Sequence, residues 1–343
     1  MPPLVVVTPF GREGGSSRVR VYDWLDHLGL VADVHDYRGG LSNRPKTLVG
    51  QPFSTLRAES ATRSVDVSGR RLVLSREASP MSGGKLEARL LKAASHGVYD
   101  VDDALFHDTD TGVRRALGKA ATWTHAVAAA DVVIAGNEYL AERASRTART
   151  VYVIPSCIEP RAYAPKLSYA LNDPPRIVWV GSPASEAYLL SIAPSLLEVH
   201  HRSGARLGVV SAGSASLGLL DPMVDRVPWS LDGVGRILAA ADVAIGPLVD
   251  SPYARGRCAY QLVQYAAAGL PMVGSPVGAN VAALEALAGF GERSESGWTE
   301  AIIGLLAAGD DVRARLGAMA RRGVEQHYSF ARWAATWRAA VLG

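Results

Sequence analysis

Short runs of aliphatic residues alternate along this chain with longer stretches in which apolar residues recur every three or four positions. The first run, Leu4–Val7, is followed by a loop, Pro9–Ser16, and then by an amphipathic stretch. In that stretch one helical face carries Val21, Leu25 and Leu28. Short, continuous apolar runs are typical of parallel strands that helices cover on both faces. The pattern therefore predicts an α/β protein with a doubly wound parallel sheet.

The second half of the chain repeats this alternation with its own series of strands and helices. Its helices are predicted at 186–199, 233–240 and 257–268, and alternation of this kind indicates right-handed βαβ units. Further strands in the first half are predicted at 72–74 and 98–99. The strands predicted in the second half are 176–180, 206–210, 226–227, 243–245 and 272–273.

One phrase occurs in both halves. Around Asp131, three alanines are followed by the aspartate and then by an apolar run, which predicts the end of a helix and the start of a strand. The same order of residues surrounds Asp242. The spacing of the other elements differs between the halves, so the chain is no tandem repeat. We interpret it as two domains of one architecture, joined through the proline-bearing passage 154–175. Two such domains would leave a cleft between the carboxyl ends of their strands, where ligands of doubly wound folds bind.

Composition excludes several classes of protein. A chain of 343 residues, 48% hydrophobic and 20% charged, is typical of a globular protein of about two domains. A net charge of +3 predicts no nucleic-acid partner, and charged or polar residues interrupt every apolar stretch before about 18 residues, so we expect no transmembrane segment. Two cysteines and the absence of a leader pattern favour a cytoplasmic protein. Only five of the 36 basic residues are lysines, and the 31 arginines suit bidentate binding of oxyanions.

Two glycine- or serine-bearing loops are candidates for phosphate binding. The loop 11–17 contains Gly14 and Gly15, and it lacks the GxGxxG order of dinucleotide-binding proteins, which argues against a dehydrogenase. The matching loop of the second half contains Ser182 and Ser185. A plain turn and serine N-caps explain the same residues without a ligand.

A third loop, 247–257, precedes the helix predicted at 257–268. It contains Asp250 and ends in Gly256 and Arg257, so that a fixed cation and the positive end of the helix dipole would together face a diphosphate. The apolar face of this helix is ordinary packing. We therefore expect the anion site at the start of the helix.

This third stretch, together with Gly278 and Asn280, resembles the nucleotide-sugar motif of the retaining GT-B glycosyltransferases of family four. The usual family motif has two glutamates separated by seven residues, and here Gly256 and Gln264 stand at those positions. A bacterial subgroup with Gly-Lys and glutamine at these places is the more similar one. The resemblance covers nearly the whole chain, through the segments 74–80, 98–106, 134–140 and 153–160.

The resemblance implies a GT-B fold, in which two Rossmann-like doubly wound domains face a central cleft. It places an acceptor domain at 1–160, a nucleotide-sugar donor domain at 161–327, and a C-terminal helix at 328–343 that crosses back to the first domain. The implied activity is transfer of a sugar from a nucleotide-sugar donor to a hydroxyl of a small-molecule or glycan acceptor. Configuration would be retained, in bacterial natural-product or surface-glycan biosynthesis. The departing diphosphate would help to deprotonate the acceptor, because no nucleophile is evident.

The triplet Asp100-Val101-Asp102 also matches the DxD motif by which GT-A glycosyltransferases hold a divalent ion. That interpretation leaves the second strand series unexplained, and the histidines have no metal-ligand spacing, so we expect neither a metal nor a cofactor. We assign Asp102 as the catalytic residue. Trp229 lies near the nucleotide base or packs in the core. The donor-binding residues are Gly14, Gly15, Ser182, Ser185, Trp229, Asp250, Gly256, Arg257, Gly278 and Asn280, and the acceptor-binding residues are Glu77, Asp103, His107 and Asn137.

Two alternatives remain open at this point. The departures at Gly256 and Gln264 also suit a non-catalytic subunit that binds a nucleotide-sugar. A GT-B-like epimerase would alter the sugar of the donor without releasing the nucleotide. Neither the base, the sugar nor the acceptor follows from the sequence.

Overall fold

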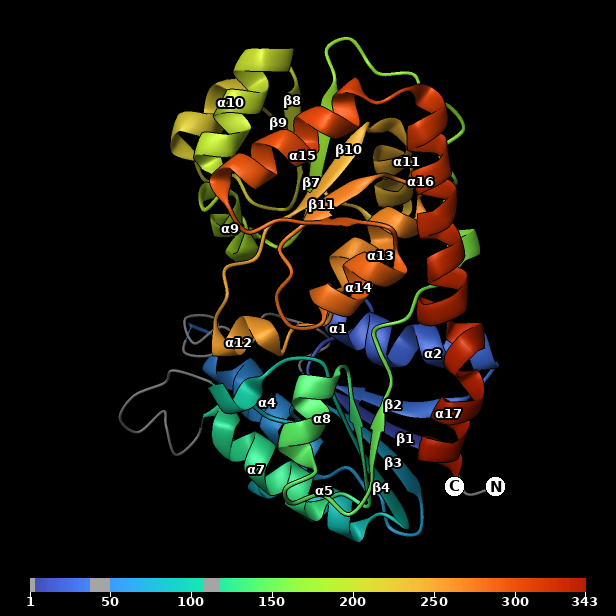
Figure 1. Ribbon diagram of the computed structural model, residues 1–343. Helices are drawn as coiled ribbons and strands as arrows, with labels where there is room; N and C mark the ends of the chain where they lie inside the picture. The colour runs from blue at the N-terminus through green and yellow to red at the C-terminus, as the bar shows by residue number, and fades with distance from the viewer. Residues whose placement is uncertain (1–3, 38–49, 108–117) are drawn as a thin grey trace. The chain divides into compact units, whose positions relative to one another are not determined.

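The computed structural model describes residues 4–37, 50–107 and 118–343 of the chain (Figure 1). These residues form two compact units, each built on a parallel sheet. Unit 1 comprises the described residues up to Cys157 together with Arg255–Cys258 and Trp333–Gly343. Unit 2 comprises Ile158–Ala254 and Ala259–Arg332. The predicted α/β fold with two doubly wound sheets is confirmed.

The sheet of unit 1 has its strands in the order β2-β1-β3-β4-β5-β6, all parallel where they pair. Strand β1 lies between β2 and β3, so the chain leaves β1 in one direction and returns to the other side of it. The carboxyl ends of β1 and β3 are therefore the place where the winding reverses, at which doubly wound folds bind ligands. The strands are β1 (Leu4–Thr8), β2 (Ala32–Asp36), β3 (Arg71–Ser75), β4 (His96–Val101), β5 (Val132–Ala135) and β6 (Val151–Val153).

One face of the sheet of unit 1 packs on the helices α5, α7 and α8. Val5, Leu72 and Tyr99 belong to one cluster with apolar residues of α5, α7 and α8, because successive side chains of a strand point to opposite faces. The helices of unit 1 are α1 (Gly15–Ser17), η1 (Arg18–Tyr22), α2 (Asp23–Leu28), α4 (Pro52–Arg63), α5 (Lys85–Ala93), η3 (Leu105–His107), α7 (Lys119–Ala129), α8 (Glu138–Ala144) and the later part of α17 (Phe330–Leu342).

The first helix of unit 1 continues from α1 to α2 through η1, which has π-helical hydrogen bonding. Arg18 and Arg20, which lie on this wider turn, are both buried. Turns of this type are frequent at functional sites. Here the turn directs two arginines inward at the point where the winding of the sheet reverses.

The half-buried carboxyl group of Asp23, at the start of α2, should make the free energy of unfolding depend on pH. Burial raises the pKa of Asp23 to about 6, against the attraction of Arg18, whose Nε lies 4.0 Å from its Oδ2. Since the folded pKa exceeds the unfolded one, the folded protein binds more protons between about pH 4 and 6, and stability falls as pH rises through this window. We expect Asp23→Asn to remove about 1–2 kcal/mol of this fall, measured by urea unfolding at pH 4 and pH 6.5. An identical pH profile in wild type and variant would contradict this assignment.

The C-terminal helix α17 packs on unit 1. The Trp337 ring stacks on the Trp24 ring, with centroids 5.4 Å apart, and both side chains are buried. His96 begins β4, and its Nε2 forms a hydrogen bond of 2.9 Å with the carbonyl of Ala340 in α17. Figure 1 shows α17 alongside α2, as this stacking requires.

The sheet of unit 2 has the order β12-β11-β10-β7-β8-β9, with β7, its first strand, near the centre. The winding reverses between β7 and β10. The strands are β7 (Arg176–Val180), β8 (Arg206–Val210), β9 (Val224–Val227), β10 (Val243–Gly246), β11 (Met272–Gly274) and β12 (Phe290–Gly291). The helices are η4 (Pro160–Ala162), η5 (Pro183–Ser185), α9 (Ala187–Leu190), α10 (Ala193–Ser203), η6 (Gly218–Met223), α11 (Leu231–Ala240), α12 (Pro252–Arg255), α13 (Tyr260–Ala267), α14 (Asn280–Ala286), α15 (Glu295–Ala307), α16 (Asp310–Gly323) and η7 (Val324–Tyr328).

Two helix predictions need correction. The helix predicted at 186–199 is broken into α9 and α10, and Pro194 lies in the first turn of the second part, where proline is tolerated. The helix predicted from Arg257 begins at Tyr260. Residues 255–258 instead belong to unit 1.

The repeated phrase has the same structural role in both units. Asp131 donates its N–H to the Gly97 carbonyl, and its Oδ2 accepts the Gly97 N–H at 2.9 Å. Asp242 makes the same pair of bonds with Arg176, where Oδ2 accepts the N–H at 2.7 Å. In each unit an aspartate at the start of one strand thus fixes the start of its neighbour.

Candidate functional site in unit 1

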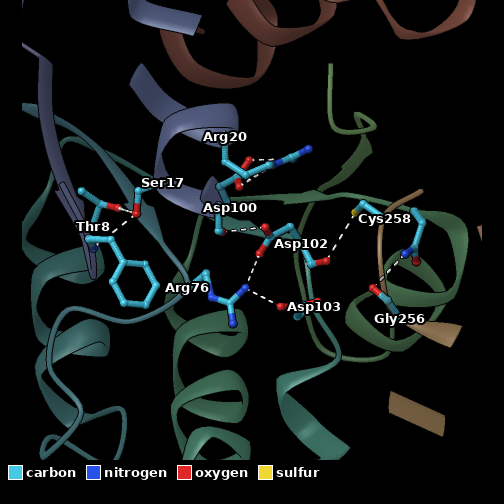
Figure 2. A network of polar contacts seen from close by, with 12 residues as sticks. Thr8, Ser17, Arg20, Arg76, Asp100, Asp102, Asp103, Gly256 and Cys258 are labelled. Atoms are coloured by element: carbon cyan, nitrogen blue, oxygen red, sulfur yellow. Dashed lines mark hydrogen bonds and ion pairs between the residues drawn. The ribbon is translucent and has the colours of Figure 1, made fainter. Parts of the chain in front are cut away.

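Three strand ends of unit 1 bring polar side chains together. Arg76 follows β3, Asp100 and Asp102 lie at the end of β4 or just after it, and Ser16 lies on the helix that follows β1. Because β1, β3 and β4 are adjacent and parallel, their carboxyl ends meet at one edge of the sheet. The resulting polar network is drawn in Figure 2.

Arg76 is the centre of this network. Its Nη1 lies 2.8 Å from Asp102 Oδ1 and 2.5 Å from Asp103 Oδ2, and Figure 2 shows the guanidinium directed between the two carboxylates. The backbone of Arg76 has φ 60°, a left-handed conformation that costs free energy for a residue other than glycine. The Tyr99 hydroxyl donates to the Arg76 carbonyl at 2.8 Å, and the Arg76 N–H donates to the Asp100 carbonyl at 2.9 Å. Strain that is held in place by surrounding hydrogen bonds is typical of functional sites.

Asp102 is ionised at neutral pH. Its Oδ2 accepts a hydrogen bond from the Ser16 hydroxyl at 2.6 Å. Burial raises the pKa of Asp102, but the nearby Arg76, the hydrogen bond from Ser16 and the charge of Arg20 together hold it below its ordinary value. A carboxylate held in this way can accept a hydrogen bond from a substrate hydroxyl.

Asp100, the first aspartate of the DxD triplet, points away from Asp102 to a different partner. It forms a two-bonded ion pair with Arg20, at 2.9 and 2.8 Å, and both side chains are at most 2% exposed. Arg20 also donates to the Ile154 carbonyl at 2.8 Å. Burial lowers the pKa of Arg20, but the charge and hydrogen bonds of Asp100 outweigh it, so that the pKa lies above its ordinary range.

This geometry bears on the metal-binding interpretation. Within the part of the chain that the structure describes, no three His, Cys, Asp or Glu side chains are grouped so as to hold a metal ion. The carboxylates of the triplet are instead neutralised by Arg20 and Arg76. The second strand series, which the GT-A interpretation leaves unexplained, is a complete six-stranded sheet.

The segment 255–258 is held against the same loop. Asn137 caps α8, because its Oδ1 accepts the Leu140 N–H at 3.0 Å, and its Nδ2 donates to the carbonyls of Gly256 at 2.9 Å and Arg257 at 3.2 Å. A side chain at Gly256 would meet the Ala104 Cβ at 2.3 Å, so only glycine fits there. Asn137, predicted to bind the acceptor, therefore has both ends of its amide in structural hydrogen bonds.

Both cysteines of the chain lie in unit 1 as free thiols. The Cys258 thiol donates to the Asp102 carbonyl at 3.3 Å, and burial raises the pKa of Cys258 to about 12. Burial also raises the pKa of Cys157 far above its usual range. Neither thiol is a thiolate nucleophile at neutral pH.

The remaining residues predicted in unit 1 surround this network. Gly14 is the N-cap of α1, and a side chain there would collide with Phe10, whereas a Cβ added at Gly15 would meet nothing within 4 Å. Glu77 is buried immediately after Arg76. His107 lies five residues after Asp102, where its Nε2 hydrogen-bonds the Tyr139 hydroxyl at 2.6 Å.

In unit 2 the predicted donor residues follow the carboxyl ends of several strands. The Ser182 and Ser185 hydroxyls hydrogen-bond each other at 2.9 Å, and the Ser182 N–H donates to Ser185 Oγ, as in a capping box at the start of η5. Asp250, after β10, is exposed. Trp229, after β9, packs against the core of unit 2. Gly278 is left-handed, with φ 55°.

Two further predicted polar residues of unit 2 have structural partners. Asn280 begins α14, and its amide donates to the Ser275 carbonyl at 3.1 Å. Gln264, at the second glutamate position of the motif, donates to the Tyr163 hydroxyl at 2.9 Å and is buried.

The sequence patterns did not indicate several site residues. In unit 2, the Tyr265 hydroxyl accepts the Val180 N–H and donates to the Ile245 carbonyl, each at 3.0 Å, so it bridges β7 and β10 where the winding reverses. Arg226 pairs with buried Glu186 at 3.1 Å. In unit 1, Ser16, Arg20 and Arg76 were missed. Ser16 lies in the candidate loop 11–17 and Arg76 in the segment 74–80, but neither was assigned a role. The excess of arginine was the one signal for Arg20, and it carries no position.

Comparison with known proteins supports the same fold. Neither a protein-family model nor a curated protein matches the sequence. Among solved structures, the sucrose-phosphate synthase of Thermosynechococcus elongatus is similar, with 14% identity, a TM-score of 0.70 and coverage of 98% of both chains. Anabaena HepE, solved in complex with UDP-glucose, has 14% identity, a TM-score of 0.67 and coverage of 98% of this chain and 99% of its own.

A third similar structure is WaaG, a glycosyltransferase involved in lipopolysaccharide biosynthesis. It has 14% identity and a TM-score of 0.66, with coverage of 99% of this chain and 100% of its own. Identities this low establish the architecture alone. The fold of the chain is the GT-B fold, with two Rossmann-like doubly wound units. No helix among the described residues is long and apolar enough to span a membrane.

Proposed function

We propose that this protein is a retaining GT-B glycosyltransferase of family four, which transfers a sugar from a nucleotide-sugar donor to a hydroxyl of an acceptor. The fold supports the class, and the complex of the similar HepE with UDP-glucose supports the donor chemistry. The observation that carries the proposal is the ionised Asp102, fixed by Arg76 and Ser16 at the edge of the sheet where doubly wound folds bind ligands.

The reaction that fits these residues needs no protein nucleophile. The bond between the anomeric carbon and the diphosphate oxygen breaks, the acceptor oxygen forms the new bond on the same face, and the acceptor proton passes to the departing diphosphate. Asp102 would accept a hydrogen bond from the acceptor hydroxyl and orient it, which lowers the barrier by positioning. The proposed acceptor residues Glu77, Asp103, His107 and Asn137 all belong to unit 1, whereas the proposed donor residues belong to both units.

Neutralisation of the diphosphate is assigned to arginine rather than to a metal ion. Arg257 is the arginine that would neutralise the diphosphate. It lies three residues before the first residue of α13, so the dipole of that helix does not add to its charge. A bacterial pathway of natural-product or surface-glycan synthesis, in the cytoplasm, is the setting we propose. The identity of the base and the sugar is left to the experiment.

The proposal is tested first by a thermal-shift screen against UDP, GDP, ADP, CMP and dTDP. One nucleotide at 100 times its dissociation constant should stabilise the fold by about 2.7 kcal/mol. Arg257→Ala should weaken its binding by about tenfold or more, because a charge-assisted contact contributes about 1.5–3 kcal/mol. Arg149→Ala, on the exposed surface of unit 1, is the control and should bind the nucleotide like wild type.

Turnover of the matching nucleotide-sugar then separates the remaining possibilities. Release of nucleotide with transfer to an acceptor, unchanged by EDTA, supports the proposal. Loss of transfer on chelation, restored by Mn²⁺, would overturn the metal-free mechanism. Binding without turnover would instead identify a nucleotide-sugar-binding subunit, and a changed sugar without nucleotide release would identify an epimerase.

A further inference from the structure

Unit 1 also contains a cavity, and the loop that carries Asp102 and Asp103 leads directly to it. A cavity of about 300 Å³ lies between η3 and the side of α8. It is lined by Phe106, His107, Tyr139, Glu142, Arg143 and Arg146. Cavities of this size hold small molecules, and their polar groups determine which ones.

The walls of this cavity are aromatic and held in place. The His107 and Tyr139 rings are nearly parallel, with centroids 6.0 Å apart, and their hydrogen bond of 2.6 Å fixes both. Phe106 packs against buried Trp123, with centroids 4.7 Å apart. Burial, with the nearby Arg143, lowers the pKa of His107, so this wall is uncharged at neutral pH. Such flat, rigid faces suit the C–H groups of a sugar ring.

The rim of the cavity carries excess positive charge. The Arg143 guanidinium lies 5.5 Å from the centre of the Phe106 ring, and among the described residues it has no carboxylate partner. Arg146 is paired with Glu142 at 3.4 Å, but both side chains are more than 60% exposed, so the pair contributes little. An arginine beside an aromatic face offers two parallel N–H donors to a carboxylate or phosphate.

We propose that this cavity binds an oxyanion carried on a sugar ring, so that the acceptor is an acidic carbohydrate. This inference rests on the proposed glycosyltransferase function. Asp103 and His107 are four positions apart in the chain, so their Cα atoms lie at most about 14 Å apart. One acceptor could therefore place a hydroxyl at the polar network and its acidic group beside Arg143.

Binding is measured by calorimetry without any donor, using glucose 6-phosphate, glucuronate, glucose and inorganic phosphate as probes. We expect glucose 6-phosphate or glucuronate to bind at least ten times more tightly than glucose and than inorganic phosphate. Arg143→Gln should weaken binding of the acidic sugar by about ten- to hundredfold. Arg149→Gln is the matched control and should bind like wild type. Only the ring signals of His107, among the histidines, should shift in NMR spectra on binding.

Each outcome decides the inference. Equal binding of glucose and glucose 6-phosphate would overturn the oxyanion site, and equal binding of inorganic phosphate would overturn the sugar site. Unchanged affinity in a folded Arg143→Gln variant would also overturn it. If acidic sugars bind through Arg143 and no donor is ever turned over, the site stands and the glycosyltransferase proposal fails. If transfer occurs equally well to neutral and acidic acceptors, the glycosyltransferase proposal stands and the acidic-acceptor inference fails.

Discussion

Replacement of Arg20 by methionine is expected to lower the free energy of unfolding by about 3–5 kcal/mol, because it leaves the Asp100 carboxylate buried without its partner. Both side chains are at most 2% exposed, so water cannot take the place of the guanidinium. The measurement is urea unfolding at pH 7. The variant Arg20→Met with Asp100→Leu, which removes both charges, should recover most of the loss.

The control for this prediction is an ion pair in solvent. Arg315 and Asp311 are 2.8 Å apart on α16, but their side chains are 68% and 72% exposed. Arg315→Met should therefore cost less than about 1 kcal/mol. Equal losses for Arg20→Met and Arg315→Met would contradict the assignment of the buried pair as a stabilising link between η1 and β4.

Replacement of Asp102 by asparagine is expected to depress turnover by about 10- to 100-fold, because a neutral amide forms a weaker hydrogen bond to the acceptor hydroxyl than a carboxylate does. The dissociation constant of the nucleotide should stay within a factor of about two, which corresponds to about 0.4 kcal/mol. Steady-state turnover and nucleotide calorimetry, performed on the same preparations, give both values.

Asp66→Asn provides the matched control. Asp66 is an exposed aspartate of unit 1 whose carboxylate accepts only local hydrogen bonds, so its replacement should leave turnover unchanged. If Asp102→Asn weakens nucleotide binding as much as Arg257→Ala does, Asp102 belongs to the donor site. If turnover is unaffected, another group orients the acceptor.

The assignment of residues to a donor group and an acceptor group is tested by how these variants differ. A donor-side contact should change nucleotide affinity, and an acceptor-side contact should change turnover or acceptor affinity alone. Asn137 is a poor choice for this comparison, because its amide caps α8 and holds the carbonyls of Gly256 and Arg257. Its replacement would disturb the segment that carries Arg257.

The strands and the class of fold could be read from the sequence because they depend on neighbouring residues. Apolar runs such as Leu4–Val7 and Ile177–Val180 have the length and the β-branched residues of buried strands, and they alternate with longer amphipathic stretches. The repeated alanine-aspartate phrase predicted a helix end and a strand start in both halves. The aspartate recurs because the carboxylates of Asp131 and Asp242 each accept a backbone N–H at the start of the neighbouring strand. The short edge strands β2 and β12 were not predicted, since neither has a continuous apolar run; the residues of β2 are mostly half-buried and those of β12 are exposed.

The site was decided by tertiary structure. Arg20 and Asp100 are 80 residues apart in the chain, and Arg76 and Asp102 are 26 apart. They meet because the sheet order places β1, β3 and β4 side by side, which no local pattern specifies. Asn137 reaches Gly256 across 119 residues for the same kind of reason. An excess of arginine and a DxD triplet are visible in the sequence. Which arginine pairs with which carboxylate depends on the order of the strands in the sheet.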